Sequence, residues 1–229
     1  MGARFEAILF DAGGVLVLPD PKVLAPLVAY YGGDDRHETY VRAHYAGMAA
    51  KSAVTAGESD WTHYNATYLS HLSVPDEHRE AALEVLTHVK SNARLWRHPI
   101  PGSAEALLEL GSRGVPIGVV SNASGQIEST LRVSGICQVG PGPHAEVRCV
   151  VDSHVVGVEK PNPLIFDHAL VHFDGIDRSR IAYVGDSLIM DVGGARAAGL
   201  FPVLVDPYDD AVDHDVERIR SLDELLKYV

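Results

Sequence analysis

Short apolar runs recur along the chain, and stretches with helical periodicity separate them. The runs that predict strands lie at 7–10, 116–120, 148–151, 181–184 and 201–205. The segments that predict helices between and after these strands lie at 102–113, 124–134, 162–172, 190–198 and 221–228. Short strands that alternate with helices are typical of a parallel sheet covered by helices. The pattern therefore predicts an α/β fold.

Two of these helices carry more specific signals. The helix at 102–113 has the i, i+3, i+4, i+7 spacing of one buried face, at Ala104, Leu107, Leu108 and Gly111. The last helix opens with Ser221-Leu222-Asp223-Glu224, the spacing of a capping box, in which each side chain bonds the other residue's backbone N–H.

The segment between the first two predicted strands is far longer than a connection in a parallel sheet needs. It predicts helices at 21–31, 35–49, 60–72 and 76–90, with breaks at Gly32-Gly33 and Pro75-Asp76. We interpret residues 17–98 as a helical cap inserted into a core formed by residues 1–16 and 99–229. The alternative is an elaborated crossover that packs tightly against the sheet.

Composition indicates the class of protein. Of the 229 residues, 46% are hydrophobic and 22% are charged, which is ordinary for a folded globular chain. The apolar runs are too short to span a bilayer, and residues 1–6 lack the basic and apolar pattern of a signal peptide. Two cysteines, Cys137 and Cys149, provide no disulfide framework and no metal-binding pair. We therefore expect a soluble cytoplasmic protein without a membrane partner.

The balance of charge limits which classes of binding partner are compatible with the chain. The chain has 19 basic and 31 acidic residues, a formal net charge of −12. A nucleic-acid binder needs a cationic surface, so this balance argues against one. A small anionic substrate is compatible with it, because one lysine, backbone N–H groups and a divalent cation can reverse the local field. The sequence leaves the oligomeric state open, and a homodimer is compatible with it.

Polar residues follow the ends of the predicted strands. They are Asp11 after the first strand, Ser121 and Asn122 after the second, Lys160 beyond the third, and Asp186 and Asp191 after the fourth. Ligands of open parallel sheets bind outside the carboxyl ends of the strands. We therefore expect these side chains to converge on one site. Asp191 is also placed to cap the helix at 190–198, a role compatible with support of a metal site.

These residues stand in four patterns, namely Phe10-Asp11-x-x-Gly14-Val15, Val120-Ser121-Asn122, Lys160-Pro161 and Gly185-Asp186-Ser187-x-x-x-Asp191-x-x-Gly194-Ala195. In residue type, order and strand context the patterns resemble the four motifs of the haloacid dehalogenase (HAD) superfamily, and they span almost the whole chain. The resemblance implies a Rossmann-like core, and the helical insertion resembles the C1-type cap of that family. It also implies a hydrolase, with the phosphatase branch and a small phosphorylated metabolite as the favoured activity and substrate.

The resemblance assigns roles to several positions. Asp11 would attack phosphorus and form an aspartyl-phosphate, which divides one difficult displacement into two easier ones. Mg²⁺ would lie between the two anions, held by the Asp11 carboxylate, the backbone carbonyl of Gly13 and Asp186. Asp191 would bind the ion directly or through water, or would orient the other ligands.

The phosphoryl oxygens require hydrogen-bond donors and positive charge. Ser121 would donate its hydroxyl, and the backbone N–H groups of Ala12, Gly13 and Asn122 are further candidates for substrate binding. Lys160 would place a fixed positive charge beside Asp11 and the phosphoryl oxygens, where negative charge is held in the transition state.

The chain departs from the family at Gly13. Phosphatases of the family carry a second aspartate there, which protonates the leaving oxygen, and a positioned proton donor is worth about 10²–10⁴ in rate. Three explanations are open: a substrate with a good leaving group, a proton donor in the cap, or a chain that binds ligand with little or no turnover. Histidine titrates near neutral pH, and the cap contains His37, His44, His63, His71, His78 and His88. Taken singly, we expect each to be an ordinary surface residue.

The dehalogenase branch also lacks the second aspartate. Its members use no metal, hold the substrate carboxylate with a cap arginine, and carry an aromatic residue where this chain has Gly13. Arg36 or Arg42 could supply the arginine, but Asp186 belongs to the metal-binding form of the fourth motif, which disfavours this branch. A phosphonate-cleaving enzyme is less favoured still, and a phosphomutase needs the missing aspartate. Neither a GxGxxG nor a Walker pattern is present.

Overall fold

Parallel strands form the centre of the larger lobe. The structure is a computed structural model that describes residues 4–53 and 61–229. In this part of the chain the main sheet has the order β10-β9-β8-β1-β4-β7, and every neighbouring pair is parallel. Its strands are β1 (Ala7–Phe10), β4 (Ile117–Ser121), β7 (Val150–Asp152), β8 (Ile181–Gly185), β9 (Phe201–Val205) and β10 (Glu217–Ile219). The predicted α/β class is confirmed, although β10, a short edge strand, was not expected from the sequence.

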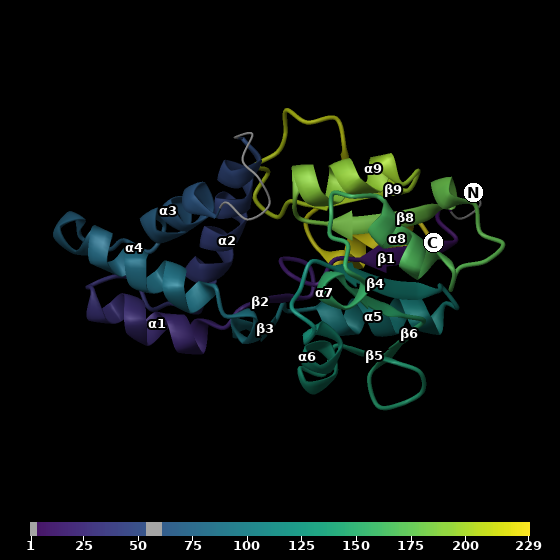
Figure 1. Ribbon diagram of the computed structural model, residues 1–229, viewed down its shortest axis with the longest axis horizontal. Coiled ribbons are helices and arrows are strands. Elements are labelled where there is room, and N and C mark those ends of the chain that lie inside the picture. Colours follow the sequence, from purple (N-terminus) through teal and green to yellow (C-terminus); the bar gives the residue numbers. More distant parts are fainter. Residues whose placement is uncertain (1–3, 54–60) are drawn as a thin grey trace.

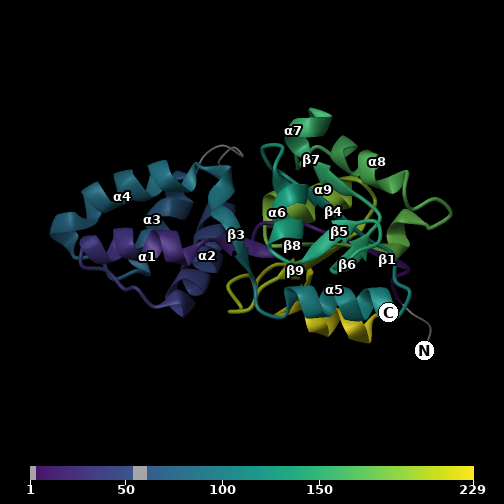
Figure 2. The same ribbon diagram turned by 90° about the horizontal axis from the view of Figure 1, so that it is seen from below.

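Helices cover both faces of this sheet because side chains alternate along each strand. On β1, Ile8 and Phe10 pack into one apolar cluster, while Ala7 and Leu9 pack into another. The first cluster includes residues of α5 (Ser103–Ser112), α6 (Ile127–Val133) and the 3₁₀-helix η4 (Leu222–Lys227). The second includes residues of α8 (Leu164–Leu170) and α9 (Gly194–Ala197). Figures 1 and 2 show α8 and α9 on one side of the sheet and α5 on the other. Burial on both faces explains why these strands are continuous apolar runs.

Shorter elements complete the larger lobe. They are α7 (Ser153–Val156), η2 (Arg178–Arg180), the π-helix η3 (Leu188–Gly193), and the parallel pair β5 (Cys137–Val139) and β6 (Ala145–Val147), whereas η1 (Ala93–Leu95) packs against the helices of the insertion. The helix predicted at 190–198 is therefore two elements, η3 followed directly by α9.

The helices of the long insertion form a smaller lobe at one end of the molecule (Figure 1). They are α1 (Pro21–Tyr30), α2 (His37–Ser52), α3 (Thr62–Ser70) and α4 (Asp76–Lys90). These helices share an apolar cluster of their own, which includes Leu24, Tyr40, Tyr64, Tyr68 and Leu86. The antiparallel pair β2 (Val17–Pro19) and β3 (Trp96–Pro99) leads into and out of this lobe. Within the described residues, no helix of either lobe is long and apolar enough to cross a membrane.

Two sequence predictions need correction, and parts of two others cannot be compared. In α5, Leu108 is 51% exposed and Gly111 is exposed, because the buried face runs through Ser103, Ala106, Leu107 and Leu110. Ser221 makes no side-chain capping bond, because η4 is a tighter 3₁₀-helix, and Glu224 accepts a hydrogen bond from the backbone N–H of Arg220 instead. Asp60, the predicted start of one cap helix, and residues 1–3 of the N-terminal segment lie outside the described residues.

Gly118 in β4 faces closely packed side chains. A Cβ atom there would lie 2.7 Å from a methyl carbon of Leu9 and 3.1 Å from the sulfur of Cys149. We expect Gly118→Ala to lower the free energy of unfolding by about 1–3 kcal/mol through overpacking. Urea denaturation followed by circular dichroism measures this change.

Gly111 provides the matched control. It lies in α5, and an added Cβ there has no atom within 4 Å. Gly111→Ala should raise the free energy of unfolding by about 0.5–1 kcal/mol, because alanine loses less backbone entropy in a helix. Equal effects of the two alanine substitutions would contradict the packing described here.

Candidate active site

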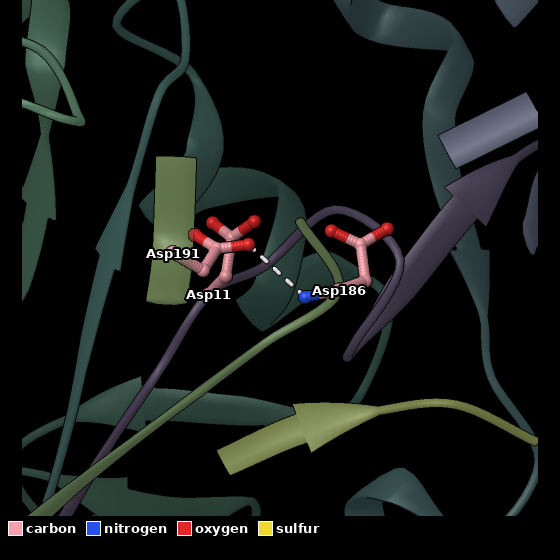
Figure 3. Close-up of side chains that lie close together, drawn as sticks. All are labelled: Asp11, Asp186 and Asp191. Carbon is pink, nitrogen blue, oxygen red and sulfur yellow. Dashed lines mark hydrogen bonds between the residues drawn. The ribbon is translucent and has the colours of Figure 1, made fainter. Parts of the chain in front are cut away.

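The sequence-predicted polar residues meet at the carboxyl edge of the main sheet. Asp11 directly follows β1, Ser121 ends β4, Asp186 directly follows β8, and Asp191 lies in η3. Among the described residues, carboxylate oxygens of Asp11, Asp186 and Asp191 lie within 4.8 Å of one another. Figure 3 shows the carboxylates of Asp11 and Asp191 next to each other, with Asp186 across from them.

The turn after β1 brings these loops together. The backbone N–H of Asp11 bonds the carbonyl of Val184 at 2.8 Å, and the carbonyl of Ala12 accepts bonds from the backbone of residues 15–17. Gly14 has a φ of +71°, and a Cβ atom there would lie 1.8 Å from Oδ2 of Asp186. Only glycine therefore fits where the first and fourth motifs touch.

The buried ammonium group of Lys160 contacts two of the three acids. Its Nζ lies 2.9 Å from Oδ1 of Asp11 and 2.7 Å from Oδ1 of Asp191, and only 2% of the side chain is exposed. It also donates to the hydroxyl of Tyr183, which in turn donates to the carbonyl of Val120, each at 2.8 Å. Burial acts to lower the pKa of Lys160, but the charges of Asp11 and Asp191 outweigh it and raise the pKa above its ordinary value. Lys160 is therefore a buried cation.

Asp191 is held by both of its oxygens. Oδ1 accepts from Lys160, and Oδ2 accepts from the backbone N–H groups of Asp186 at 3.0 Å and Ser187 at 2.9 Å, the first of which is dashed in Figure 3. The expected helix cap is not Asp191 but Ser187, whose hydroxyl accepts from the backbone N–H of Met190. With both oxygens engaged, the Asp191 carboxylate is placed to orient Asp186 and Lys160.

The acids are crowded. Burial raises the pKa of Asp11 to about 7 against the opposing charge of Lys160, and the charges of Asp191 and Asp186 add to the rise. Burial and the charge of Asp191 likewise hold the pKa of Asp186 well above its ordinary value. A divalent cation, which prefers carboxylate and carbonyl oxygens, would fit this donor set and relieve the crowding.

Asn122 has a role that the sequence did not reveal. Its Nδ2 donates to the carbonyl of Lys160 at 3.0 Å, and its Oδ1 accepts from the backbone N–H of Lys160 at 2.8 Å. This pair of bonds ties the end of β4 to the loop that carries the lysine. The neighbouring Ser121 is buried and lines the cavity described below.

The cap contributes a histidine to the site. His44 is 1% exposed, with Nε2 2.8 Å from Oδ2 of Asp186 and Nδ1 2.8 Å from the hydroxyl of Tyr64. The expectation of a surface residue is wrong for His44, whereas His37, His63, His78 and His88 are exposed and His71 is half-buried. Burial and the charge of Lys90 lower the pKa of His44 to about 3, so the ring is neutral at pH 7. No feature of the sequence separated His44 from the other cap histidines.

A cavity of about 630 Å³ lies above the acids, between the two lobes. The core lines it with Asp11, Ser121, Lys160 and their neighbours, and the cap lines it with Lys51, Asn65 and Lys90 among others. The ring of Trp96 lies over Gly13, where a Cβ atom would be 3.3 Å from two ring carbons. The ring therefore occupies the space that a side chain at position 13 would enter.

The arginines considered for a dehalogenase lie elsewhere. Arg42 pairs with both carboxylate oxygens of Asp210, at 2.7 and 2.9 Å, and stacks on Tyr208. Arg36 pairs with Asp34. Within the described part of the chain no arginine lines the cavity, so the structure offers no guanidinium for a substrate carboxylate there.

Part of this chain is similar in sequence to proteins of known name. A glyceraldehyde 3-phosphate phosphatase of Methanopyrus kandleri is 32% identical over 165 residues, which are 67% of this chain and 66% of that protein. A pyrimidine 5'-nucleotidase of Escherichia coli is 36% identical over 134 residues, which are 56% of each protein. The matched part of the chain spans about half to two thirds of the length of the curated relatives.

Solved structures share the fold. A HAD phosphatase from Thermococcus onnurineus superposes with a TM-score of 0.60 at 21% identity, over 97% of each chain. A 2-haloacid dehalogenase from Pseudomonas syringae superposes with a TM-score of 0.55 at 18% identity, over 98% of this chain and 97% of the other. Since the fold is common to both branches, it does not choose between their reactions.

The comparison with protein families covers most of the chain. Residues 5–199 match the family described as haloacid dehalogenase-like hydrolase. The match includes all four motifs and the helical insertion between the first two. The chain therefore belongs to the haloacid dehalogenase-like hydrolase family.

Proposed function

We propose that the protein is a magnesium-dependent phosphatase that hydrolyses a small phosphorylated metabolite through an aspartyl-phosphate on Asp11. The observation that carries this proposal is the convergence of Asp11, Asp186 and Asp191, with the buried Lys160 in contact with two of them, at the floor of the cavity between the lobes. Several relatives are phosphatases by name, such as a phosphoserine phosphatase of Thermus thermophilus, and they support phosphorylated metabolites as the substrate class.

Each residue has a distinct task in the proposed reaction. Asp11 attacks phosphorus, and the ester oxygen leaves with the alcohol, so that a second displacement by water regenerates the carboxylate. Lys160 and the hydroxyl of Ser121 hold the phosphoryl oxygens, and backbone N–H groups of Ala12, Gly13 and Asn122 complete that cradle. Residues 17–98, as the cap, exclude bulk water from the cavity.

The metal ligands in this proposal are the carboxylates of Asp11 and Asp186 and the carbonyl of Gly13. Asp191 supports them through its bonds to Asp186 and Lys160. The bound Mg²⁺ would supply positive charge that screens the nucleophile from the phosphate.

Gly13 determines which esters react fastest. Among the described residues that line the cavity, the carboxylates are those of the proposed nucleophile, metal ligand and ligand support, and both nitrogens of His44 are engaged. Within this part of the chain the leaving oxygen has no dedicated proton donor, and we propose that substrates with good leaving groups are favoured.

Removal of the nucleophile should abolish turnover. We expect Asp11→Asn to lower phosphate release from p-nitrophenyl phosphate by at least about 10³-fold, because the amide retains the shape and cannot form the acyl phosphate. Asp174→Asn, at an exposed aspartate of the larger lobe, is the matched control and should leave the rate unchanged. Full activity of the Asp11 variant would contradict the mechanism.

Metal binding can be read without turnover. Calorimetry should detect Mg²⁺ binding to the wild-type protein, and Asp186→Asn should weaken it by about 10-fold or more, because a charged ligand is lost. Chelation should stop phosphate release, and added Mg²⁺ should restore it. Turnover that survives chelator, or unchanged Mg²⁺ affinity in the variant, would exclude the proposed ion site.

Restoring an acid at position 13 tests the missing proton donor. We expect Gly13→Asp to raise kcat on an alkyl phosphate by about 10-fold or more over Gly13→Asn, which has the same size and no acid. On p-nitrophenyl phosphate the two variants should be equal, since that leaving group needs little protonation. Because the Trp96 ring must shift to admit either side chain, each variant is also measured with Trp96→Leu. No gain in either background would favour a relative that binds ligand with little turnover.

A further inference from the structure

Lys90, at the end of α4, carries a buried amine for which the described residues supply no counter-charge. Its side chain lines the cavity and is 8% exposed. Its Nζ has no hydrogen-bond partner, and among the described residues no carboxylate pairs with it. Buried ammonium groups in proteins are normally paired, because removal from water disfavours their charged form. Burial accordingly holds the pKa of Lys90 well below its ordinary value.

The aromatic surroundings of Lys90 favour its charged form. The Nζ lies 3.3 Å from the ring centre of Tyr68 and 3.9 Å from that of Tyr64, so two aromatic faces stabilise its charge on the cap side. The charge of Lys90 also acts on His44, the cap residue that contacts Asp186, and so it faces the same cavity as the proposed reaction centre.

Two neighbours extend this environment. Lys51, whose Nζ lies 3.7 Å from the ring centre of Trp61, also lines the cavity, and its charge acts to lower the pKa of Asp186. Asn65 lines the cavity as well, and its Oδ1 is buried with no hydrogen-bond partner, although its Nδ2 donates to Thr87. The wall of the cavity opposite the core that would hold phosphate therefore contains two lysines and, within the described part of the chain, an amide oxygen without a hydrogen-bond partner.

We propose that Lys90, with Lys51 from the same cavity wall, binds a second anionic group of the substrate, a carboxylate or a second phosphate, while the first phosphate lies against Asp11 and Lys160. This inference rests on the proposed phosphatase function and adds the class of substrate to it. The unpaired Oδ1 of Asn65 is suited to a hydroxyl next to that anion. An anion at this position supplies the counter-charge that the ammonium lacks among the described residues.

A binding role and a structural role of Lys90 have opposite consequences for the stability of the ligand-free protein. A lysine that only packed on the tyrosines would gain from its cation–π contacts less than its burial costs, and an apolar residue of similar shape would serve better. Lys90→Met should therefore raise the melting temperature of the ligand-free protein, by about 2 °C or more. A fall of several degrees would assign Lys90 to the stability of the cap and overturn the inference.

Binding of two non-hydrolysable phosphonates provides the direct test. 3-Phosphonopropionate and propylphosphonate differ only in a carboxylate that replaces a methyl group. In calorimetry with Mg²⁺ present, the wild-type protein should bind the first at least about 10-fold more tightly, and Lys90→Met should reduce that ratio to near 1. Lys22→Met, at an exposed lysine of the same lobe, should leave the ratio unchanged. Equal affinities in the wild type, or an unchanged ratio in Lys90→Met, would overturn the inference.

Turnover separates the two sources of the anion and the two proposals. 3-Phosphoglycerate is compared with glycerol 3-phosphate, and fructose 1,6-bisphosphate with fructose 6-phosphate. The pair with the larger wild-type ratio of kcat/KM identifies carboxylate or phosphate, and that ratio should collapse in Lys90→Met. No turnover of any ester, with the phosphonate affinity ratio intact, would remove the phosphatase proposal and retain the anion site. Turnover of the esters with equal affinities for the two phosphonates would retain the phosphatase proposal and remove the anion site.

Discussion

The contact of Lys160 with Asp11 and Asp191 is the interaction on which the site depends. Three carboxylates meet at one sheet edge, where burial makes their charged forms costly. The positive charge of Lys160 offsets part of that cost. Lys160 keeps this charge because two of the acids contact it. The bonds from Asn122 and Tyr183 hold the lysine in place, so residues from β1, β4, β8 and the loop that carries Lys160 contribute to one arrangement of charge.

Close packing at glycine positions makes that arrangement possible. A Cβ atom at Gly14 would collide with Asp186, and one at Gly185 would lie 2.2 Å from Cβ of Asp191. Gly14 therefore allows the loops of the first and fourth motifs to approach each other, and Gly185 allows Asp191 to pack against the end of β8 within the fourth motif. Gly13 differs from these two, because the neighbour of its missing Cβ is the Trp96 ring, which belongs to the strand that leads out of the cap. The absence of an acid at position 13 and the position of Trp96 are thus parts of one local packing.

The cap and the core contribute opposite charges to the cavity. The core supplies the acids with Lys160, and the cap supplies Lys51, Lys90 and the neutral His44. His44 touches Asp186 directly, so the placement of the cap and the environment of the acid are physically coupled. The tyrosines that form the apolar core of the cap also form the ring faces beneath Lys90. The same residues therefore stabilise the cap and hold a lysine of the cavity wall in place.

The main sheet, and the site residues that the core contributes, were predictable from local sequence patterns. Strands buried on both faces are continuous apolar runs, and polar residues at their ends in a parallel sheet must meet at one edge. Asp11, Ser121, Lys160, Asp186 and Asp191 could be named for this reason, without coordinates.

The cap residues of the site were decided by tertiary structure alone. Whether His44 or His37 reaches the acids depends on how α2 packs against the core, and α2 carries no clear apolar face that would show its orientation. In the same way, Lys90 is the last residue of an amphipathic helix, a position where lysine is ordinary. Its burial on Tyr64 and Tyr68 follows from contacts between α3 and α4. Sequence periodicity determines which residues share a helix face, but the partner of that face is determined only when the helices pack.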